Sequence, residues 1–127
     1  MKNPKLYEAL MATGHWGDVE VKLGIEFDFK CAYCDKNLLE SVDNYKEWQT
    51  EHIIPHSKCG SDDESNFALT CRTCNFIKGV WNPKDHFVGL NPNKHDLIAV
   101  AKSYVLQKRS ETNNDISLYL HLIKQHS

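Results

Sequence analysis

The chain has 127 residues, of which 41% are hydrophobic and 25% are charged, and its formal net charge at pH 7 is −2. These values are ordinary for a soluble globular protein of one domain. No apolar run approaches the ~20 residues that cross a bilayer, and the N-terminus lacks the apolar segment of a secretory signal. We therefore expect a cytoplasmic protein without membrane contact. Because the net charge is slightly negative, the chain has no general surplus of basic residues. Attraction to nucleic acid must therefore come from a local patch or from bound metal ions.

Residues 1–14 predict either a short helix or a loosely ordered arm. In the helical alternative, Pro4 lies in the first turn and Gly14 ends the helix. The apolar side chains Leu6, Leu10 and Met11 would then face inward. Nothing in this segment indicates chemistry.

Residues 18–30 alternate between apolar and polar side chains, a period of two that is typical of a strand. A helix competes with that interpretation. Asp18 could cap a short helix that ends at Gly24, with only residues 25–29 extended. In either case the apolar side chains belong to the core.

Two Cys-x-x-Cys pairs are the most specific pattern in the chain, and their members are Cys31, Cys34, Cys71 and Cys74. Four thiolates form a closed tetrahedral site suited to a structural zinc ion. A redox role is disfavoured because neither pair follows a thioredoxin-like βαβ pattern. The 36 residues between the pairs exceed the usual 15–20 of a simple four-Cys finger, so a folded segment should lie between them. Cys59 is left over as a free thiol in a loop.

The segment between the pairs predicts two strands and a helix. The expected elements are a polar connection at 41–47, a strand at 48–54, a polar loop at 56–66, a second strand at 67–70 and a helix at 71–78. Pro55 should end the first strand, because proline has no N–H to donate to a ladder. Gly79 should end the helix.

Residues 93–109 have apolar side chains at spacings of three and four, which indicates an amphipathic helix. Residues 113–115, Asn-Asn-Asp, could cap a last helix. We expect both helices to pack on the domain. The alternative is that the C-terminal helices form a homodimer interface or bind a protein partner.

Three stretches of the chain together resemble an HNH endonuclease: Glu51-His52-Ile53-Ile54-Pro55, then Cys59 to Phe67, then Leu69 to Gly79. The resemblance is to the branch that carries one Cys-x-x-Cys before the motif and a Cys-x-x-Cys-Asn within it. It covers residues 31–79 and leaves 1–30 and 80–127 uncovered. It implies an α+β protein with a ββα-metal core stapled by the four-Cys zinc site. We expect one domain over 1–127, with 1–30 and 93–127 as flanking elements.

The resemblance also implies the roles of four site residues. His52 matches the general base that takes a proton from the attacking water. Glu51 and Asn75 match the ligands of a catalytic divalent cation, Mg²⁺ or another. Asn66 matches the residue that orients the histidine and steadies the loop. The family often has Asp in place of Glu51, and Gly-Gly where this chain has Cys59-Gly60.

Elementary chemistry agrees with these roles. A divalent cation stabilises the charge that develops when a phosphodiester is cleaved, and Mg²⁺ prefers oxygen ligands. A histidine near neutrality can deprotonate water. Adjacent strand residues point to opposite faces, so Glu51 and His52 need a bend or twist to serve one site, and Pro55 and the following loop could supply it. Four further side chains are candidates for phosphate contacts: His56, Lys58, Arg72 and Lys78.

The sequence therefore predicts a metal-dependent endonuclease that hydrolyses DNA, with RNA not excluded, through a water activated by His52. One alternative is a zinc-stabilised nucleic-acid-binding module without catalysis. Another is an adaptor whose C-terminal helices dock a larger partner.

Overall fold

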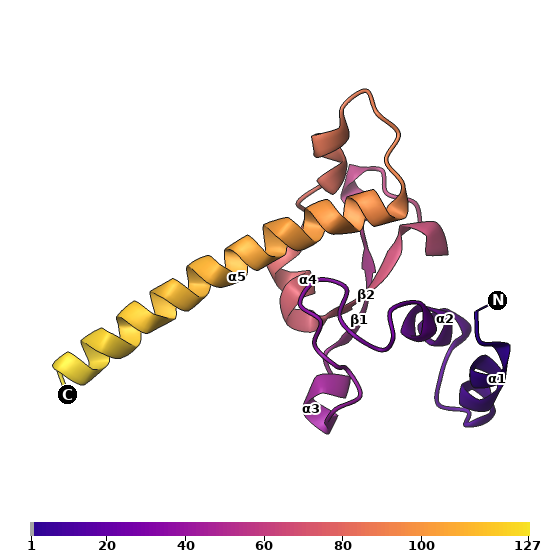
Figure 1. Cartoon of the computed structure of the whole chain (residues 1–127), viewed down its shortest axis with the longest axis horizontal. Helices are drawn as coiled ribbons and strands as arrows, with labels where there is room; N and C mark the ends of the chain where they lie inside the picture. Colours follow the sequence, from indigo (N-terminus) through magenta and orange to yellow (C-terminus); the bar gives the residue numbers. More distant parts are fainter. Residues whose placement is uncertain (1) are drawn as a thin grey trace.

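A computed structural model describes residues 2–127, and Met1 lies outside the described residues. A small body surrounds a two-stranded sheet, and one long helix extends away from it (Figure 1). The helices and strands are α1 (Pro4–Ala12), α2 (Asp18–Glu26), α3 (Val42–Tyr45), β1 (Trp48–His52), β2 (Phe67–Cys71), α4 (Arg72–Lys78) and α5 (Lys94–Gln125). Three 3-10 turns join them: η1 (His56–Lys58), η2 (Glu64–Asn66) and η3 (Pro83–Phe87). The expected α+β class is confirmed.

The two strands are antiparallel, and α4 follows β2 directly, which gives the expected strand–strand–helix order. Trp48 pairs with Cys71 at one end of the ladder and His52 pairs with Phe67 at the other. The first strand ends two residues before the expected boundary at residue 54. The backbone there bonds to a single residue, Asn66, instead of a continuing partner strand.

The strand predicted for residues 18–30 is wrong, because α2 is a helix. The helical alternative was also inexact: Gly17 is the N-cap, the helix passes Gly24 and ends at Glu26, and residues 25–29 are not extended. A run of apolar residues at every second position also contains pairs four apart, so the pattern fits a helix equally well. Gly24 lets this helix pack tightly, because a Cβ there would lie 2.6 Å from the Phe29 ring.

The N-terminal helix is confirmed as α1. Asn3 caps it by accepting a hydrogen bond from the backbone N–H of Leu6, and Pro4 occupies its first turn. Gly14 follows with a φ of 75°, in the left-handed region that a glycine adopts without strain. The expected connection at 41–47 contains the single turn of α3.

The two C-terminal helices predicted from the sequence are one helix, α5, of 32 residues. Asn93 and Asp96 form a capping box at its start. Residues 113–115 lie inside the helix and cap nothing. From residue 94 onward the chain contains no glycine or proline, so three polar residues alone do not break the helix.

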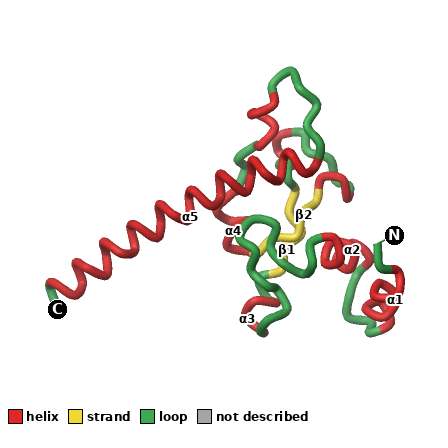
Figure 2. The backbone as a smooth tube through the Cα atoms, in the orientation of Figure 1, coloured by secondary structure: helices red, strands yellow, loops and turns green. Residues whose placement is uncertain are grey.

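The first part of α5 packs into the core, and the rest leaves the body (Figure 2). Its buried residues are Leu97, Ala101 and Val105. The main core lies around the cysteine pairs, where Leu23, Tyr33, Leu38 and Leu69 join the cysteines, Ala101 and Val105. Among the described residues, no helix is both long enough and apolar enough to span a membrane.

We predict that Asn93→Ala destabilises the protein by about 1 kcal/mol, because the substitution removes the side chain that caps α5. Urea unfolding measures the loss. Asn91→Ala, two residues earlier and also exposed, should change stability by less than about 0.5 kcal/mol. Equal losses in the two variants would show that the capping box contributes nothing.

Candidate metal centres and active site

The four cysteines converge on one point. Their sulfur atoms all lie within 4.8 Å of one another, and three of the four residues are buried. Cys31 and Cys34 come from the turn before α3, Cys71 ends β2 and caps α4, and Cys74 lies in the first turn of that helix. Four mutually close sulfurs fit one tetrahedral zinc ion with no open ligand position. The cluster could therefore hold zinc in a structural role.

Hydrogen bonds between the thiols shift the pKa values of the four cysteines in opposite directions. They lower the pKa of Cys34 and Cys71 and raise the pKa of Cys31 and Cys74. Zinc binds the thiolate form of cysteine, so a bound ion would hold all four sulfurs as thiolates.

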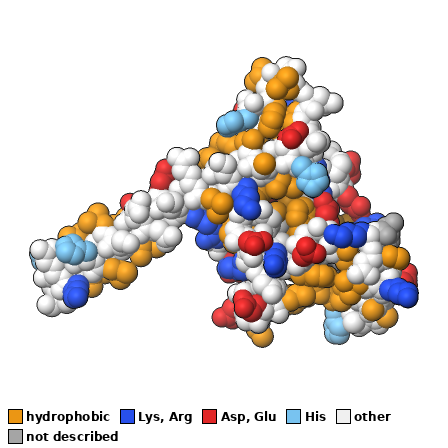
Figure 3. Space-filling model, viewed as in Figure 1, with side chains coloured by type: hydrophobic (Ala, Val, Ile, Leu, Met, Phe, Trp, Pro, Cys, Tyr) orange, Lys and Arg blue, Asp and Glu red, His pale blue; other side chains and the backbone are white. Residues whose placement is uncertain are grey.

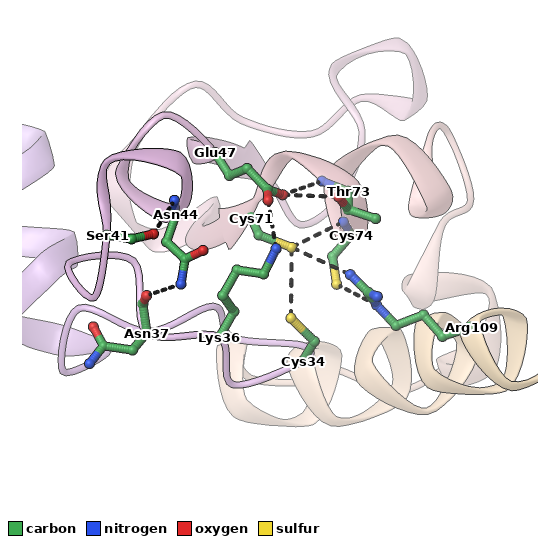
Figure 4. Close-up of polar contacts among 10 residues, drawn as sticks. All are labelled: Cys34, Lys36, Asn37, Ser41, Asn44, Glu47, Cys71, Thr73, Cys74 and Arg109. Atoms are coloured by element: carbon green, nitrogen blue, oxygen red, sulfur yellow. Dashed lines mark hydrogen bonds and ion pairs between the residues drawn. The ribbon is translucent and has the colours of Figure 1, made fainter. Parts of the chain in front are cut away.

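The side chain of Arg109, which lies on α5, contacts the cysteine cluster (Figure 4). Its Nε donates to Cys74 Sγ at 3.2 Å and its Nη2 donates to Cys71 Sγ at 3.6 Å. Burial alone would lower the pKa of Arg109, but the hydrogen bond to Cys74 and the charge of the cluster raise it. A guanidinium beside four thiolates offsets part of their negative charge and ties α5 to the start of α4.

A second group of polar residues braces the same region (Figure 4). Glu47 accepts hydrogen bonds from Lys36 Nζ at 2.6 Å and from Thr73 Oγ1 at 2.9 Å. The bond from Lys36 holds the pKa of Glu47 below its ordinary value. The turn that carries the first cysteine pair is thereby joined to the helix that carries the second.

A separate cavity of about 410 Å³ opens at the other end of the sheet. It brings together Glu51, His52 and Asn75, which the sequence assigned to one site. Thr50, Pro55, His56, Ser57, Gly79 and Val80 complete its lining. The end of β1, the loop after it and the end of α4 thus form the walls.

His52 is held by a partner that sequence reasoning missed. Its Nε2 lies 2.9 Å from Asp62 Oδ1, and its ring packs edge-on against Phe67 with 5.1 Å between ring centres. The ring of His56 lies 6.0 Å away. A carboxylate on one imidazole nitrogen fixes the tautomer and the ring orientation, and leaves the other nitrogen for chemistry.

Glu51 is buried, with 4% of its side chain exposed, and its neighbour there is Lys78. Lys78 Nζ lies 3.0 Å from Glu51 Oε1 and also donates to the backbone oxygen of His52 at 3.4 Å. Burial raises the pKa of Glu51, and the positive charge of Lys78 opposes that rise. Oε1 is occupied by this ion pair, whereas Oε2 has no hydrogen-bond partner among the described residues. The carboxylate therefore keeps acceptor capacity for a cation.

Lys78 differs from the expectation of a surface lysine that contacts phosphate, since its side chain is fully buried. The other three candidates for phosphate contacts, His56, Lys58 and Arg72, are exposed. His56 also lines the cavity, on the turn η1.

The two asparagines have different surroundings. Asn75 donates to Gln49 Oε1 at 3.4 Å, which leaves its own amide oxygen as a ligand. Asn66 is buried and bonds three times to the loop: its side chain accepts from Ile54 N and donates to Ile54 O and Ser61 O, each at 2.9 Å. Asn66 therefore fastens the loop that follows His52.

Gly60 completes this loop by allowing a close approach of two backbone segments. A Cβ at Gly60 would lie 1.9 Å from the backbone oxygen of Ile54, a distance that no side chain can tolerate. The preceding residue, Cys59, is exposed and has a φ of 67°, in the left-handed region where glycine is favoured.

Residues 31–80 match the family model described as HNH endonuclease. This segment is an HNH domain. The match confirms the resemblance inferred from the motifs, and it points to a nuclease or another function on nucleic acid. No curated protein and no solved structure matches the chain. The assignment of 1–127 to a single domain stays a prediction, because the match leaves both flanks uncovered.

Sequence reasoning missed three residues that contact members of the cysteine cluster or of the candidate active site. Asp62 stands in an acidic loop run, Gln49 precedes the motif, and Arg109 lies 35 positions after Cys74. A single sequence carries no signal for Arg109. Gln49 could have been found from the sequence, because it lies two residues before Glu51 and residues two apart on a strand point to the same face.

We predict that Arg109→Ala speeds zinc loss from the cysteine cluster about tenfold, because it removes the donor to two of the four sulfurs. A chromogenic chelator follows the release. Lys108→Ala, the neighbouring change on the exposed side of α5, should release zinc at the rate of the unmodified protein. Identical rates for Arg109→Ala and Lys108→Ala would contradict the role given to Arg109.

We predict that Asn66→Ala destabilises the protein by about 1–3 kcal/mol, since the backbone groups of the loop then lose their partners. Chemical unfolding measures this. Ser61→Ala serves as control, because it keeps the backbone oxygen to which Asn66 donates. A loss below about 0.5 kcal/mol in Asn66→Ala would mean that the loop does not depend on this side chain.

Proposed function

We propose that this HNH domain is a metal-dependent endonuclease that hydrolyses phosphodiester bonds in DNA. The observation that carries the proposal is the convergence of Glu51, His52 and Asn75 on one cavity. A carboxylate, an imidazole and an amide are the groups that metal-assisted hydrolysis of a phosphodiester needs.

Glu51 and Asn75 would hold a divalent cation such as Mg²⁺ through a carboxylate and an amide oxygen. The Oε2 atom of the buried Glu51 carboxylate, which has no partner among the described residues, supports this fit. When bound, such an ion acts as a Lewis acid on the phosphate. Because burial raises the pKa of Glu51, the carboxyl would bind the ion more weakly as pH falls.

His52 would accept the proton of the attacking water. Asp62 supports this role, because its carboxylate on Nε2 stabilises the imidazolium that forms and directs Nδ1 to the water. Asn66 would act as a positioning residue, since it fixes the loop that starts beside His52.

His56, Lys58 and Arg72 would contact the DNA backbone. All three are exposed, and His56 lies in the wall of the cavity. With a net charge of −2, binding would depend on such local contacts, and should weaken as salt rises. RNA is the competing substrate and is tested in the same assay.

One observation favours a second candidate, a zinc-stabilised nucleic-acid-binding module without catalysis. The Lys78 ammonium already neutralises Glu51 at 3.0 Å, so the carboxylate has a cation without any metal ion. In that case the protein would bind nucleic acid but leave it intact in every divalent metal.

We predict that pure zinc-loaded protein nicks supercoiled plasmid in Mg²⁺ or Mn²⁺ and not in EDTA. His52→Ala should lower the rate at least ~100-fold, because it removes the general base. The control is His15→Ala, an exposed histidine outside the cavity, which should cleave normally. A parallel reaction with a folded RNA tests the other substrate.

The proposal fails if His52→Ala cleaves as fast as the unmodified protein. It also fails if no divalent metal supports cleavage of DNA although the protein binds DNA, which is the result that the binding module predicts. Zinc content and circular dichroism of each variant exclude loss of the fold as the cause.

A further inference from the structure

The distal part of α5 leaves a series of large apolar side chains exposed. Every residue from 110 to 127 is exposed. Six of the eight residues from 116 to 123 are nevertheless large and apolar: Ile116, Leu118, Tyr119, Leu120, Leu122 and Ile123. Their exposed fractions run from 42% to 63%. Figure 3 shows hydrophobic side chains along this projecting part of the helix.

Four of these side chains form a stripe along the helix, and Leu118 and Leu122 lie on its other side. At 100° per residue, Ile116, Leu120 and Ile123 lie within about 60° of one another, at the 4-and-3 spacing of a helix–helix seam. Tyr119 borders them on one side. Such a stripe is typical of a helix that packs against another helix.

We propose that residues 110–125, here called the α5 tail, form the interface of a homodimer in which the tails of two copies pack along each other. Burying Ile116, Tyr119, Leu120 and Ile123 of both copies would remove somewhat less than about 1,000 Å² from water, the size of a weak or transient interface. The tail projects away from the body (Figure 1), so nothing in the chain obstructs a second copy.

The polar residues of the tail are compatible with self-pairing. The stretch from Ile116 to Ile123 contains no Asp, Glu, Lys or Arg, so two copies bring no like charges together at the centre. Extending the seam by one step toward the N-terminus reaches Asn113. An asparagine in a seam can bond to the same residue of an identical helix, and it is known to specify register and oligomeric state.

Dimerisation has a consequence that rests on the proposed nuclease function. Two copies carry two cavities, one for each strand of a duplex, so a dimer could convert a nick into a double-strand break. The interface itself does not depend on cleavage. The two ideas can therefore fail separately.

The experiment measures the molar mass of the full-length zinc-loaded protein by light scattering at tens of micromolar. We expect twice the mass of one chain. The double variant Ile116→Glu/Ile123→Glu should give the mass of one chain, because two charges would be buried in the seam. The matched control, Asn114→Glu/His121→Glu, carries the same two charges at the same spacing on the opposite face and should stay dimeric.

Unmodified protein with the mass of one chain would overturn the proposal and leave the tail to a different partner. Equal dissociation of both double variants would also overturn it, since the stripe would then have no special role. Unchanged zinc content and helicity show that the variants are folded. Plasmid nicking by the monomeric variant tests the cavity independently of the mass.

Discussion

The convergence of four sulfur atoms is the constraint on which the HNH domain depends. The cysteines come from a turn near the N-terminal side of the sheet and from the junction of β2 and α4. A zinc ion among them would close a long loop, and structural zinc contributes on the order of 10 kcal/mol to small domains. Arg109 extends the constraint to α5, because its guanidinium bonds to two of the sulfurs. The cysteine cluster thus fixes the positions of β2 and α4. These two elements in turn position the residues around the cavity at the far end of the sheet.

The candidate active site contains a buried carboxylate that is paired with a lysine. A buried carboxylate needs a cation nearby, and removing one member of a buried ion pair costs about 3–5 kcal/mol. Lys78 supplies that cation to Glu51 in the free protein. A divalent ion at Glu51 and Asn75 would therefore have to displace the ammonium or share the carboxylate with it. This competition would make metal affinity, and not the geometry of His52, the weaker part of the proposed catalytic arrangement.

Much of the domain was predictable because its signals are local. Two Cys-x-x-Cys pairs, a proline after the strand and a glycine after the helix mark β1, β2 and α4 to within two residues. The failures came where a pattern fits two structures. Alternation over residues 18–30 fits a helix as well as a strand, and Asn113 to Asp115 resemble a cap but lie within a helix that no glycine or proline interrupts. Lys78 and Arg109 contact residues far along the chain, and Asp62 is one of several acidic residues in a loop, so a single sequence does not reveal these pairings.

The measurement that tests the central claim most directly is a titration of zinc-loaded protein with Mn²⁺, followed by electron paramagnetic resonance. We expect one Mn²⁺ site per chain in addition to the zinc, and its loss in Glu51→Gln. A protein that binds no Mn²⁺, or that binds it equally well in Glu51→Gln, would contradict a divalent cation at Glu51 and with it the proposed mechanism.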